Sequence, residues 1–300
     1  MLAQSVQSAC FTRKRSTVRI CHAPQLPQRL RKMVIGIDIG STTTKVAAID
    51  SNHDIIKVKT RAIDAITSAT GAFGKMIMEN HFKLENIEKI NITGAGASKI
   101  TDNLFGIRTN RIDELKAIGI GGKYLSKKDH IIISNIGTGT AIIEVNGDSI
   151  THIGGTGVGG GTIIGLSKEL LKTSDFDTIL KYASKGHLNN VDLNIGDIAE
   201  TNIGFLNKEF TASNFGKMLD TATKEDIAIG IINLTYQVIG MLSVFAVKGK
   251  NNFNVVITGN GSNNPIGKKI LNEVSRMYMI DFEFPADAEY ATAIGAALSD

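Results

Sequence analysis

Two short segments rich in Gly, Ser and Thr hold the residues best suited to phosphate chemistry. The first, DIGSTTTK, runs from Asp38 to Lys45, and the second, NIGTGT, runs from Asn135 to Thr140. Such a turn presents backbone N–H groups and hydroxyls to an anion, a lysine adds positive charge, and an aspartate can hold Mg²⁺ directly or through water. Each segment alone is compatible with a polar β-hairpin, but two matching turns predict a site that holds a polyphosphate between them.

A third segment, Thr151–Ser167, carries seven glycines between Gly154 and Gly165 and includes the pattern G-x-G-x-x-G. A dinucleotide-binding fingerprint would need a following strand that ends in an acid about 20 residues on, whereas KTSDFDTILKY has no strand pattern. A linker is disfavoured by the apolar residues that resume at once in TIIGLSKELL. The run therefore predicts backbone that approaches a ligand closely and then opens a helix, whose N-terminus attracts anions. A further glycine cluster, VVITGNGS at Val255–Ser262, also follows a strand pattern and suits a nucleotide base and ribose.

The elements around these segments alternate between strand and helix patterns. Three apolar runs with short turns predict strands at residues 33–40, 44–50 and 54–60, followed by a helix near 69–82 and a strand at 90–93. Helices are then expected near residues 97–104 and 112–125, and a further helix near 160–171.

A second set of strand patterns, at residues 130–137, 140–147 and 148–155, repeats the first in outline. The stretch VIGIDIGSTTTKVAAID matches IIISNIGTGTAIIEVNG, which indicates an internal duplication. We therefore expect an α/β protein with two domains of mixed sheets flanked by helices, at residues 33–128 and 129–300, with a cleft between them. The last helix can pack back on the first domain.

The charge of the chain is concentrated in its N-terminal segment. Seven of the 33 basic residues and none of the 29 acidic ones lie in residues 1–32, so the rest carries 26 basic against 29 acidic residues. A nucleic-acid partner is therefore not expected. The segment is Arg- and Ser-rich like an organellar transit peptide, or it is a disordered or non-native extension upstream of a start at Met33. Both cysteines, Cys10 and Cys21, lie in it, so a disulfide framework is not expected for the rest, and the cytoplasm is its natural setting.

The 21 residues from Ile227 to Val247 carry no charge, which meets the length of a membrane span. Polar residues such as Asn233, Thr235 and Gln237 interrupt the run, and it stands alone in the chain. A long helix buried in the protein core is the favoured interpretation, and a membrane partner is not expected.

Taken together, these motifs resemble the actin-like ATPase superfamily of sugar kinases, heat-shock chaperones and actin, which has two ribonuclease-H-like domains. Within it, essentially all of Met33–Asp300 is similar to the type II (eukaryotic-like, Fumble family) pantothenate kinases. The resemblance rests on GIDIGSTTTK, NIGTGT, GGTGVGGGTIIGL, VDL at Val191–Leu193, FTASNFG at Phe210–Gly216 and AIGAAL at Ala293–Leu298. It implies an ATP- and Mg²⁺-dependent kinase that phosphorylates pantothenate to 4′-phosphopantothenate, the first step of coenzyme A biosynthesis, as a homodimer.

The resemblance also implies a set of site residues. A glutamate on the helix between the phosphate turns serves as general base in that family, and it corresponds to Glu114, with Asp113 as the rival carboxylate. Glu114 shares a helical face with Ile118 and Gly121. The implied nucleotide contacts are Asp38 (also the Mg²⁺ ligand), Gly40, Ser41, Thr42, Thr43, Thr44, Lys45, Thr138, Gly160, Gly161, Thr162, Ile163, Ile164, Phe176 and Asn260. The implied acceptor contacts are Thr140, His152, Gly154 and Gly155.

One of these positions departs from the family pattern. His152 stands where the family commonly has an arginine, and a histidine cannot form the two-pronged contact of a guanidinium group. A superfamily kinase with another alcohol or sugar acceptor therefore remains an alternative, as does an ATP-switched activator. GIDIGSTTTK also resembles the ATPase activators of acyl-CoA dehydratases, but those carry cysteines for a bridging iron–sulfur cluster, and residues 33–300 contain none.

Overall fold

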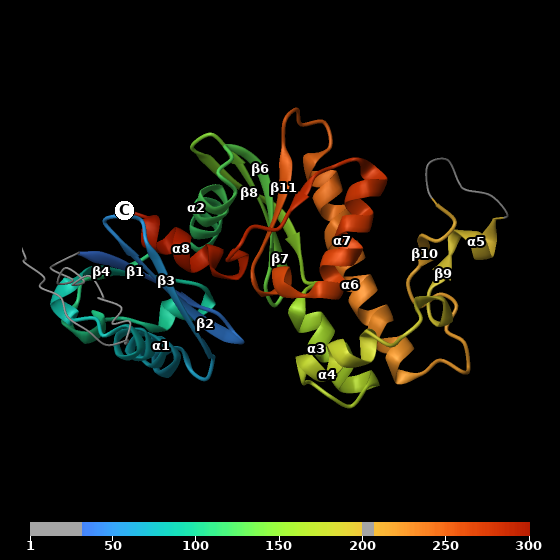
Figure 1. Cartoon of the computed structure of the whole chain (residues 1–300), viewed down its shortest axis with the longest axis horizontal. Coiled ribbons are helices and arrows are strands. Elements are labelled where there is room, and N and C mark those ends of the chain that lie inside the picture. Colours follow the sequence, from blue (N-terminus) through green and yellow to red (C-terminus); the bar gives the residue numbers. More distant parts are fainter. Residues whose placement is uncertain (1–31, 200–206) are drawn as a thin grey trace, which may run out of the picture. The chain divides into compact units, whose positions relative to one another are not determined.

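The computed structural model describes residues 32–199 and 207–300 and contains two five-stranded mixed sheets (Figure 1). The first sheet has the order β3-β2-β1-β4-β5, with β1 antiparallel to β2 and parallel to β4. Its strands are β1 (Met33–Ile39), β2 (Thr43–Asp50), β3 (Ile55–Arg61), β4 (Ile87–Thr93) and β5 (Thr109–Arg111). The three strands predicted for the start of this sheet are confirmed.

The second sheet repeats this topology with the order β8-β7-β6-β11-β12. An antiparallel meander of three strands is again followed by a parallel strand beside its first member. The strands are β6 (His130–Ile136), β7 (Thr140–Asn146), β8 (Ser149–Thr156), β11 (Asn254–Thr258) and β12 (Phe282–Glu283). The expected duplication is thus present in the fold, and the two hydroxyl-rich turns occupy equivalent places, between β1 and β2 and between β6 and β7.

Eight α-helices and a small two-stranded sheet complete the described residues. The helices are α1 (Ala65–Asn80), α2 (Glu114–Ser126), α3 (Gly160–Leu170), α4 (Phe176–Ala183), α5 (Ile195–Ile198), α6 (Lys224–Val247), α7 (Pro265–Tyr278) and α8 (Ala291–Leu298). The small sheet pairs β9 (Leu193–Asn194) with β10 (Thr211–Ser213).

Both faces of the first sheet are buried, which explains why β1 is apolar along almost its whole length. On one face, Ile35 and Ile37 pack with Phe73 and Met76 of α1. On the other, Ala47 and Ile49 of β2 pack with small residues of α8. The last helix of the chain therefore packs on the first sheet, as expected. Helix α2 in turn covers the second sheet, where its Ile118 joins the apolar residues of β6 and β7.

Glycines allow α2, α8 and β1 to meet at backbone distance. A Cβ on Gly121 of α2 would lie 1.8 Å from the Ala291 carbonyl oxygen of α8. A Cβ on Gly295 of α8 would lie 1.8 Å from the carbonyl oxygen of Ala117 in α2. On the other side of α8, a Cβ on Gly36 of β1 would lie 2.0 Å from the carbonyl oxygen of Ala293. Because no side chain fits at these glycines, the three elements are held in a fixed mutual position.

Helix α6 is the one helix of the described residues that is long and apolar enough to cross a membrane. Two-thirds of its apolar window is nevertheless buried, and Ile231, Ile232 and Tyr236 belong to the core under the second sheet. Its buried polar side chains are bonded; for example, Asn233 donates to the Asp192 carboxylate. These contacts are those of a core helix.

The prediction of a helix at residues 97–104 is wrong. Two short 3₁₀ helices, Ala95–Lys99 and Leu104–Gly106, take its place. Side chains compete for the backbone here, because Asn103 accepts from the Thr109 N–H and the Thr109 hydroxyl accepts from the Leu104 N–H. Such local side-chain bonds are a known alternative to helical ones.

Candidate active site

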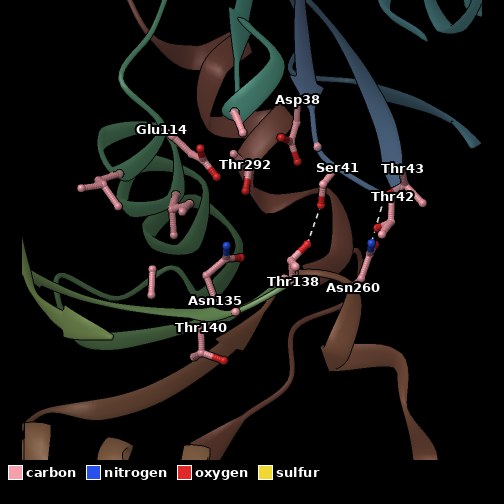
Figure 2. A pocket seen from close by; sticks show the side chains of 18 of the residues that line it. Asp38, Ser41, Thr42, Thr43, Glu114, Asn135, Thr138, Thr140, Asn260 and Thr292 are labelled. Atoms are coloured by element: carbon pink, nitrogen blue, oxygen red, sulfur yellow. Dashed lines mark hydrogen bonds between the residues drawn. The ribbon is translucent and has the colours of Figure 1, made fainter. Parts of the chain in front are cut away.

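A pocket of about 460 Å³ brings together the two hydroxyl-rich turns, the start of α2 and the start of α8 (Figure 2). Eleven of the predicted site residues line it: Asp38, Gly40, Ser41, Thr42, Thr43, Lys45, Glu114, Thr138, Thr140, His152 and Asn260. Segments 222 positions apart in the sequence therefore contribute to one cavity.

The first turn connects β1 to β2 and exposes its hydroxyls because the backbone closes on itself. The Gly40 N–H donates to the Thr43 carbonyl oxygen, and a Cβ on Gly40 would lie only 2.8 Å from that oxygen. Ser41 and Thr42 at the tip are exposed. The tip of the turn is therefore accessible, and anion binding by its hydroxyls stays a prediction.

The second turn, between β6 and β7, faces the first across the pocket (Figure 2). The Ser41 and Thr138 hydroxyls form a hydrogen bond of 2.5 Å, and the Asn260 side-chain amide donates to the Thr43 hydroxyl over 2.9 Å. Polar groups of both turns thus lie within reach of a single polyphosphate.

The glycine run supports the second turn from behind. The N–H groups of Gly160 and Gly161, at the start of α3, donate to the carbonyl oxygens of Gly137 and Thr138. A Cβ on Gly159 would lie 2.7 Å from the Thr138 carbonyl oxygen, so the close approach that the glycines permit is made to the turn itself. The predicted nucleotide contacts in this run, Gly160, Gly161, Thr162, Ile163 and Ile164, do not line the pocket, and their contact with ATP stays a prediction.

Four further predicted contacts also lie outside the pocket lining. Thr44 is fully buried in β2, and Phe176 begins α4 and packs against the core under the second sheet. Gly154 and Gly155 lie in β8, where a Cβ on Gly155 would meet the Thr140 carbonyl oxygen at 2.5 Å. Thr140 itself lines the pocket, but its hydroxyl donates to the Val158 carbonyl oxygen.

Asp38 and Lys45 form a buried pair at the pocket wall. They are cross-strand neighbours in β1 and β2, and the Lys45 Nζ lies 3.8 Å from an Asp38 carboxylate oxygen. Lys45 is 5% exposed and Asp38 is 7% exposed. Burial raises the pKa of Asp38 and lowers the pKa of Lys45, and their mutual attraction only partly offsets both shifts. A polyphosphate with its counter-cation would supply further charges to both groups.

Glu114 and Asp113 differ in what they face. The Asp113 carboxylate caps α2 by accepting from the Lys116 N–H. Glu114, the first residue of α2, instead projects into the pocket. Partial burial raises the pKa of Glu114, the negative charges of Asp38 and Asp113 raise it further, and Lys45 offsets part of the shift. Of the two carboxylates, Glu114 is therefore the one placed to act on a bound molecule.

The residues present fit a magnesium ion that arrives with a nucleotide. Within residues 32–199 and 207–300, no three His, Cys, Asp or Glu side chains gather into a protein-only metal site. Mg²⁺ in nucleotide sites uses one or two carboxylates, waters and phosphate oxygens instead. Asp38 supplies one such carboxylate beside the phosphate turns.

Several lining residues were not assigned from the sequence. Thr292 is the second residue of α8 and directly precedes the AIGAAL motif, and Asn135 opens the NIGTGT motif. Leu115, Ile118 and Ala141 are apolar residues of the lining. The motifs offered a signal for Asn135, whereas Thr292 joins the pocket only through the crossing of α8 with α2.

Comparisons with known proteins agree on the family. Residues 127–299 match the model of the Fumble family. The chain is 30% identical over 280 residues to a type II pantothenate kinase of Bacillus anthracis, covering 88% of this chain and 96% of the relative. A type II pantothenate kinase of Oceanobacillus iheyensis is 30% identical over 276 residues, covering 88% and 98% of the two chains.

Solved structures show the same fold at lower identity. The activator of the 2-hydroxyisocaproyl-CoA dehydratase from Clostridium difficile, with bound ADPNP, superposes with a TM-score of 0.63 at 18% identity, covering 89% of this chain and 93% of that one. A ROK-family glucokinase from Streptomyces griseus, in complex with glucose and AMPPNP, gives a TM-score of 0.54 at 12% identity, covering 88% and 98%. These structures share the actin-like ATPase fold with this chain. On the family match and the relatives at 30% identity, the chain belongs to the Fumble family of actin-like ATPase-fold kinases.

Proposed function

We propose that this protein transfers the γ-phosphoryl group of ATP to the 4′-hydroxyl of pantothenate, the first step of coenzyme A biosynthesis. The observation that carries the proposal is the single pocket in which Glu114 faces both hydroxyl-rich turns. The similarity to type II pantothenate kinases over most of the chain supports pantothenate as the acceptor.

The geometry suits an in-line transfer. The two turns and Lys45 hold the triphosphate, and Glu114 receives the proton of the acceptor hydroxyl. The hydroxyl oxygen forms a bond to the γ-phosphorus while the bond from that phosphorus to the bridging oxygen breaks, and its electrons leave with ADP. Mg²⁺ held beside Asp38 would neutralise phosphate charge. Positioning and charge neutralisation supply most of the catalysis in such reactions.

The acceptor side of the pocket supports a compact, partly apolar alcohol. Leu115, Ile118 and Ala141 contribute apolar surface to the lining, and His152 also lines the pocket. Because His152 replaces the family arginine, an acceptor other than pantothenate is the second candidate. An ATP-switched activator is the third; the dehydratase activator shares the fold alone, and residues 32–300 contain no cysteine for a bridging cluster.

A panel of acceptors separates these candidates. Purified protein is incubated with ATP and Mg²⁺ and with pantothenate, pantetheine, glucose or no acceptor, and ADP release and the phosphorylated product are measured. We expect ADP release that depends on pantothenate and a product of the mass of 4′-phosphopantothenate. Phosphorylation of another alcohol alone would support the second candidate, and acceptor-independent ADP release the third.

Two further properties belong to the same proposal. We expect a homodimer, because α6 is longer than one sheet needs for cover and its Phe245 is 60% exposed; a monomeric mass in solution would contradict this. We also expect a cytoplasmic enzyme without a nucleic-acid or membrane partner. The N-terminal extension to which the transit-peptide interpretation applies lies outside the described residues, apart from Lys32, and a mass measurement on the native N-terminus would test it.

A further inference from the structure

Thr292 places a hydroxyl in the pocket that sequence reasoning did not assign. The residue is only 4% exposed, yet it lines the same cavity as Glu114 and Asp38. In Figure 2 its hydroxyl points into the space between these two carboxylates. Among the residues that the structure describes, it has no hydrogen-bond partner. The hydroxyl is not one of the fully buried polar atoms that lack a partner, so it keeps some exposure to the pocket, where an atom of a bound molecule can reach it.

The position of Thr292 is set by backbone contacts and is therefore precise. Its neighbour Ala291 lies with its carbonyl oxygen against Gly121 of α2, and Ala293 lies with its carbonyl oxygen against Gly36 of β1. Helix α2 carries Glu114, and β1 carries Asp38. The hydroxyl is thus held relative to both carboxylates by the same crossing that forms the pocket.

A reacting alcohol needs its oxygen oriented in four directions. One bond goes to its own carbon, the O–H points to the base, and one lone pair faces the phosphorus. The second lone pair remains, and a hydrogen-bond donor there fixes rotation of the hydroxyl group. Glu114 and Asp38 cannot donate when ionised, and Lys45 is paired with Asp38, so the Thr292 hydroxyl beside Glu114 is a donor suited to this task.

We propose that Thr292 donates a hydrogen bond to the acceptor hydroxyl and orients it between Glu114 and the γ-phosphorus. The inference rests on the proposed function, since it assumes that the acceptor alcohol lies beside Glu114. It assigns Thr292 as a substrate-binding residue for the alcohol and separates its role from nucleotide binding.

The variants that test it are Thr292→Val, which replaces the hydroxyl by a methyl group of similar shape, and Thr292→Ser, which keeps the hydroxyl. We expect Thr292→Val to lower kcat/KM for pantothenate by about 10-fold, the loss of one hydrogen bond in the transition state, with the KM for ATP changed less than about 2-fold. Thr292→Ser should retain activity within about 3-fold. The control is Thr60→Val, because it makes the same substitution in β3 at a hydroxyl that is buried and unbonded but does not line the pocket.

Calorimetric binding of pantothenate and of its 4′-deoxy analogue, with a non-hydrolysable ATP analogue present, tests the contact directly. The wild type should bind pantothenate more tightly than the deoxy analogue, and Thr292→Val should show a smaller difference, because only the Glu114 contact to the 4′-hydroxyl remains. Thermal unfolding of each variant reports whether the fold is intact, and Thr292→Ala replaces Thr292→Val if the latter does not fold.

Each outcome bears on one claim. If the wild type phosphorylates pantothenate and Thr292→Val does so equally well, the inference is overturned and the proposed function stands. If Thr292→Val raises the KM for ATP and leaves discrimination against the deoxy analogue intact, the hydroxyl serves the nucleotide and the inference is also wrong. If the wild type does not phosphorylate pantothenate, both the proposed function and the inference about Thr292 are wrong.

Discussion

Glu114 and Asp113 are adjacent carboxylates with different roles, and the difference comes from the start of α2. A helix leaves its first N–H groups unsatisfied, and Asp113 precedes the helix where its side chain can accept from one of them. Glu114 is then directed into the pocket. From the sequence, the family resemblance implied Glu114 as the base, with Asp113 as the rival carboxylate.

The first prediction separates these two residues. Glu114→Gln should lower kcat for pantothenate phosphorylation by about 10²–10⁴-fold, because the base is lost while the shape is kept. Asp113→Asn should retain most activity, since asparagine caps helices about as well as aspartate. Steady-state ADP release measures both, and full activity of Glu114→Gln would refute the assignment.

The pH dependence follows from the raised pKa of Glu114. Its protonated form cannot accept a proton, so kcat/KM should fall on the acid side with a midpoint above 4.5, the ordinary value for a glutamate. Because the Asp113 charge contributes to this shift, the midpoint should move to lower pH in Asp113→Asn. If the acid-side midpoint of kcat/KM is the same in Asp113→Asn as in the wild type, a group other than Glu114 causes the fall in activity.

Lys45 offers a test of the nucleotide side. Lys45→Ala should raise the KM for ATP far more than the KM for pantothenate, because the variant loses the cation beside the phosphate turns. Lys59→Ala is the matched control, because Lys59 lies opposite Lys45 in the β2–β3 register. Its side chain instead makes a partly exposed ion pair with Glu289, and such ion pairs contribute little to stability. Equal effects on both KM values would count against the placement of Lys45.

At the scale of elements, the crossing of α2 with α8 positions Glu114 and Thr292 together. Gly121→Ala would place a Cβ 1.8 Å from the Ala291 carbonyl oxygen, so the helices must separate. We expect a loss of at least about 2 kcal/mol in the free energy of unfolding and a lower kcat. Gly71→Ala in α1 is the control, because nothing lies within 4 Å of its added Cβ, and it should gain about 0.5–1 kcal/mol. Urea unfolding measures both, and a Gly121→Ala protein as stable as wild type would contradict the tight crossing.

The sequence predicted the elements that local patterns determine. The apolar runs and the Gly-Thr turns between them led to both three-stranded meanders and both phosphate turns, because strand and turn signals act over a few residues. Residues 97–104 were mispredicted, since side-chain bonds from Asn103 and Thr109 displace the helix. The bonds from the Gly160 and Gly161 N–H groups to the second turn could not be predicted from the glycine pattern, and the predicted contact of this run with ATP stays a prediction. Thr292 could not be found, because its place depends on packing between distant segments.

At the scale of the whole described chain, function depends on two copies of one topology. Each sheet contributes one hydroxyl-rich turn, and the bonds from Ser41 to Thr138 and from Asn260 to Thr43 join them. A triphosphate entering between the turns would replace the Ser41–Thr138 contact with bonds from both hydroxyls to phosphate oxygens. The nucleotide would thereby become the link between the two sheets, and the proposed acceptor would meet it at the start of α2.

The most direct test of this account is a crystal structure of the protein with a non-hydrolysable ATP analogue, Mg²⁺ and pantothenate. We predict the triphosphate between the turns at Gly40–Thr43 and Gly137–Gly139, and the pantothenate 4′-hydroxyl within hydrogen-bond distance of the Glu114 carboxylate. A triphosphate bound away from either turn, or an acceptor hydroxyl out of reach of Glu114, would contradict the account.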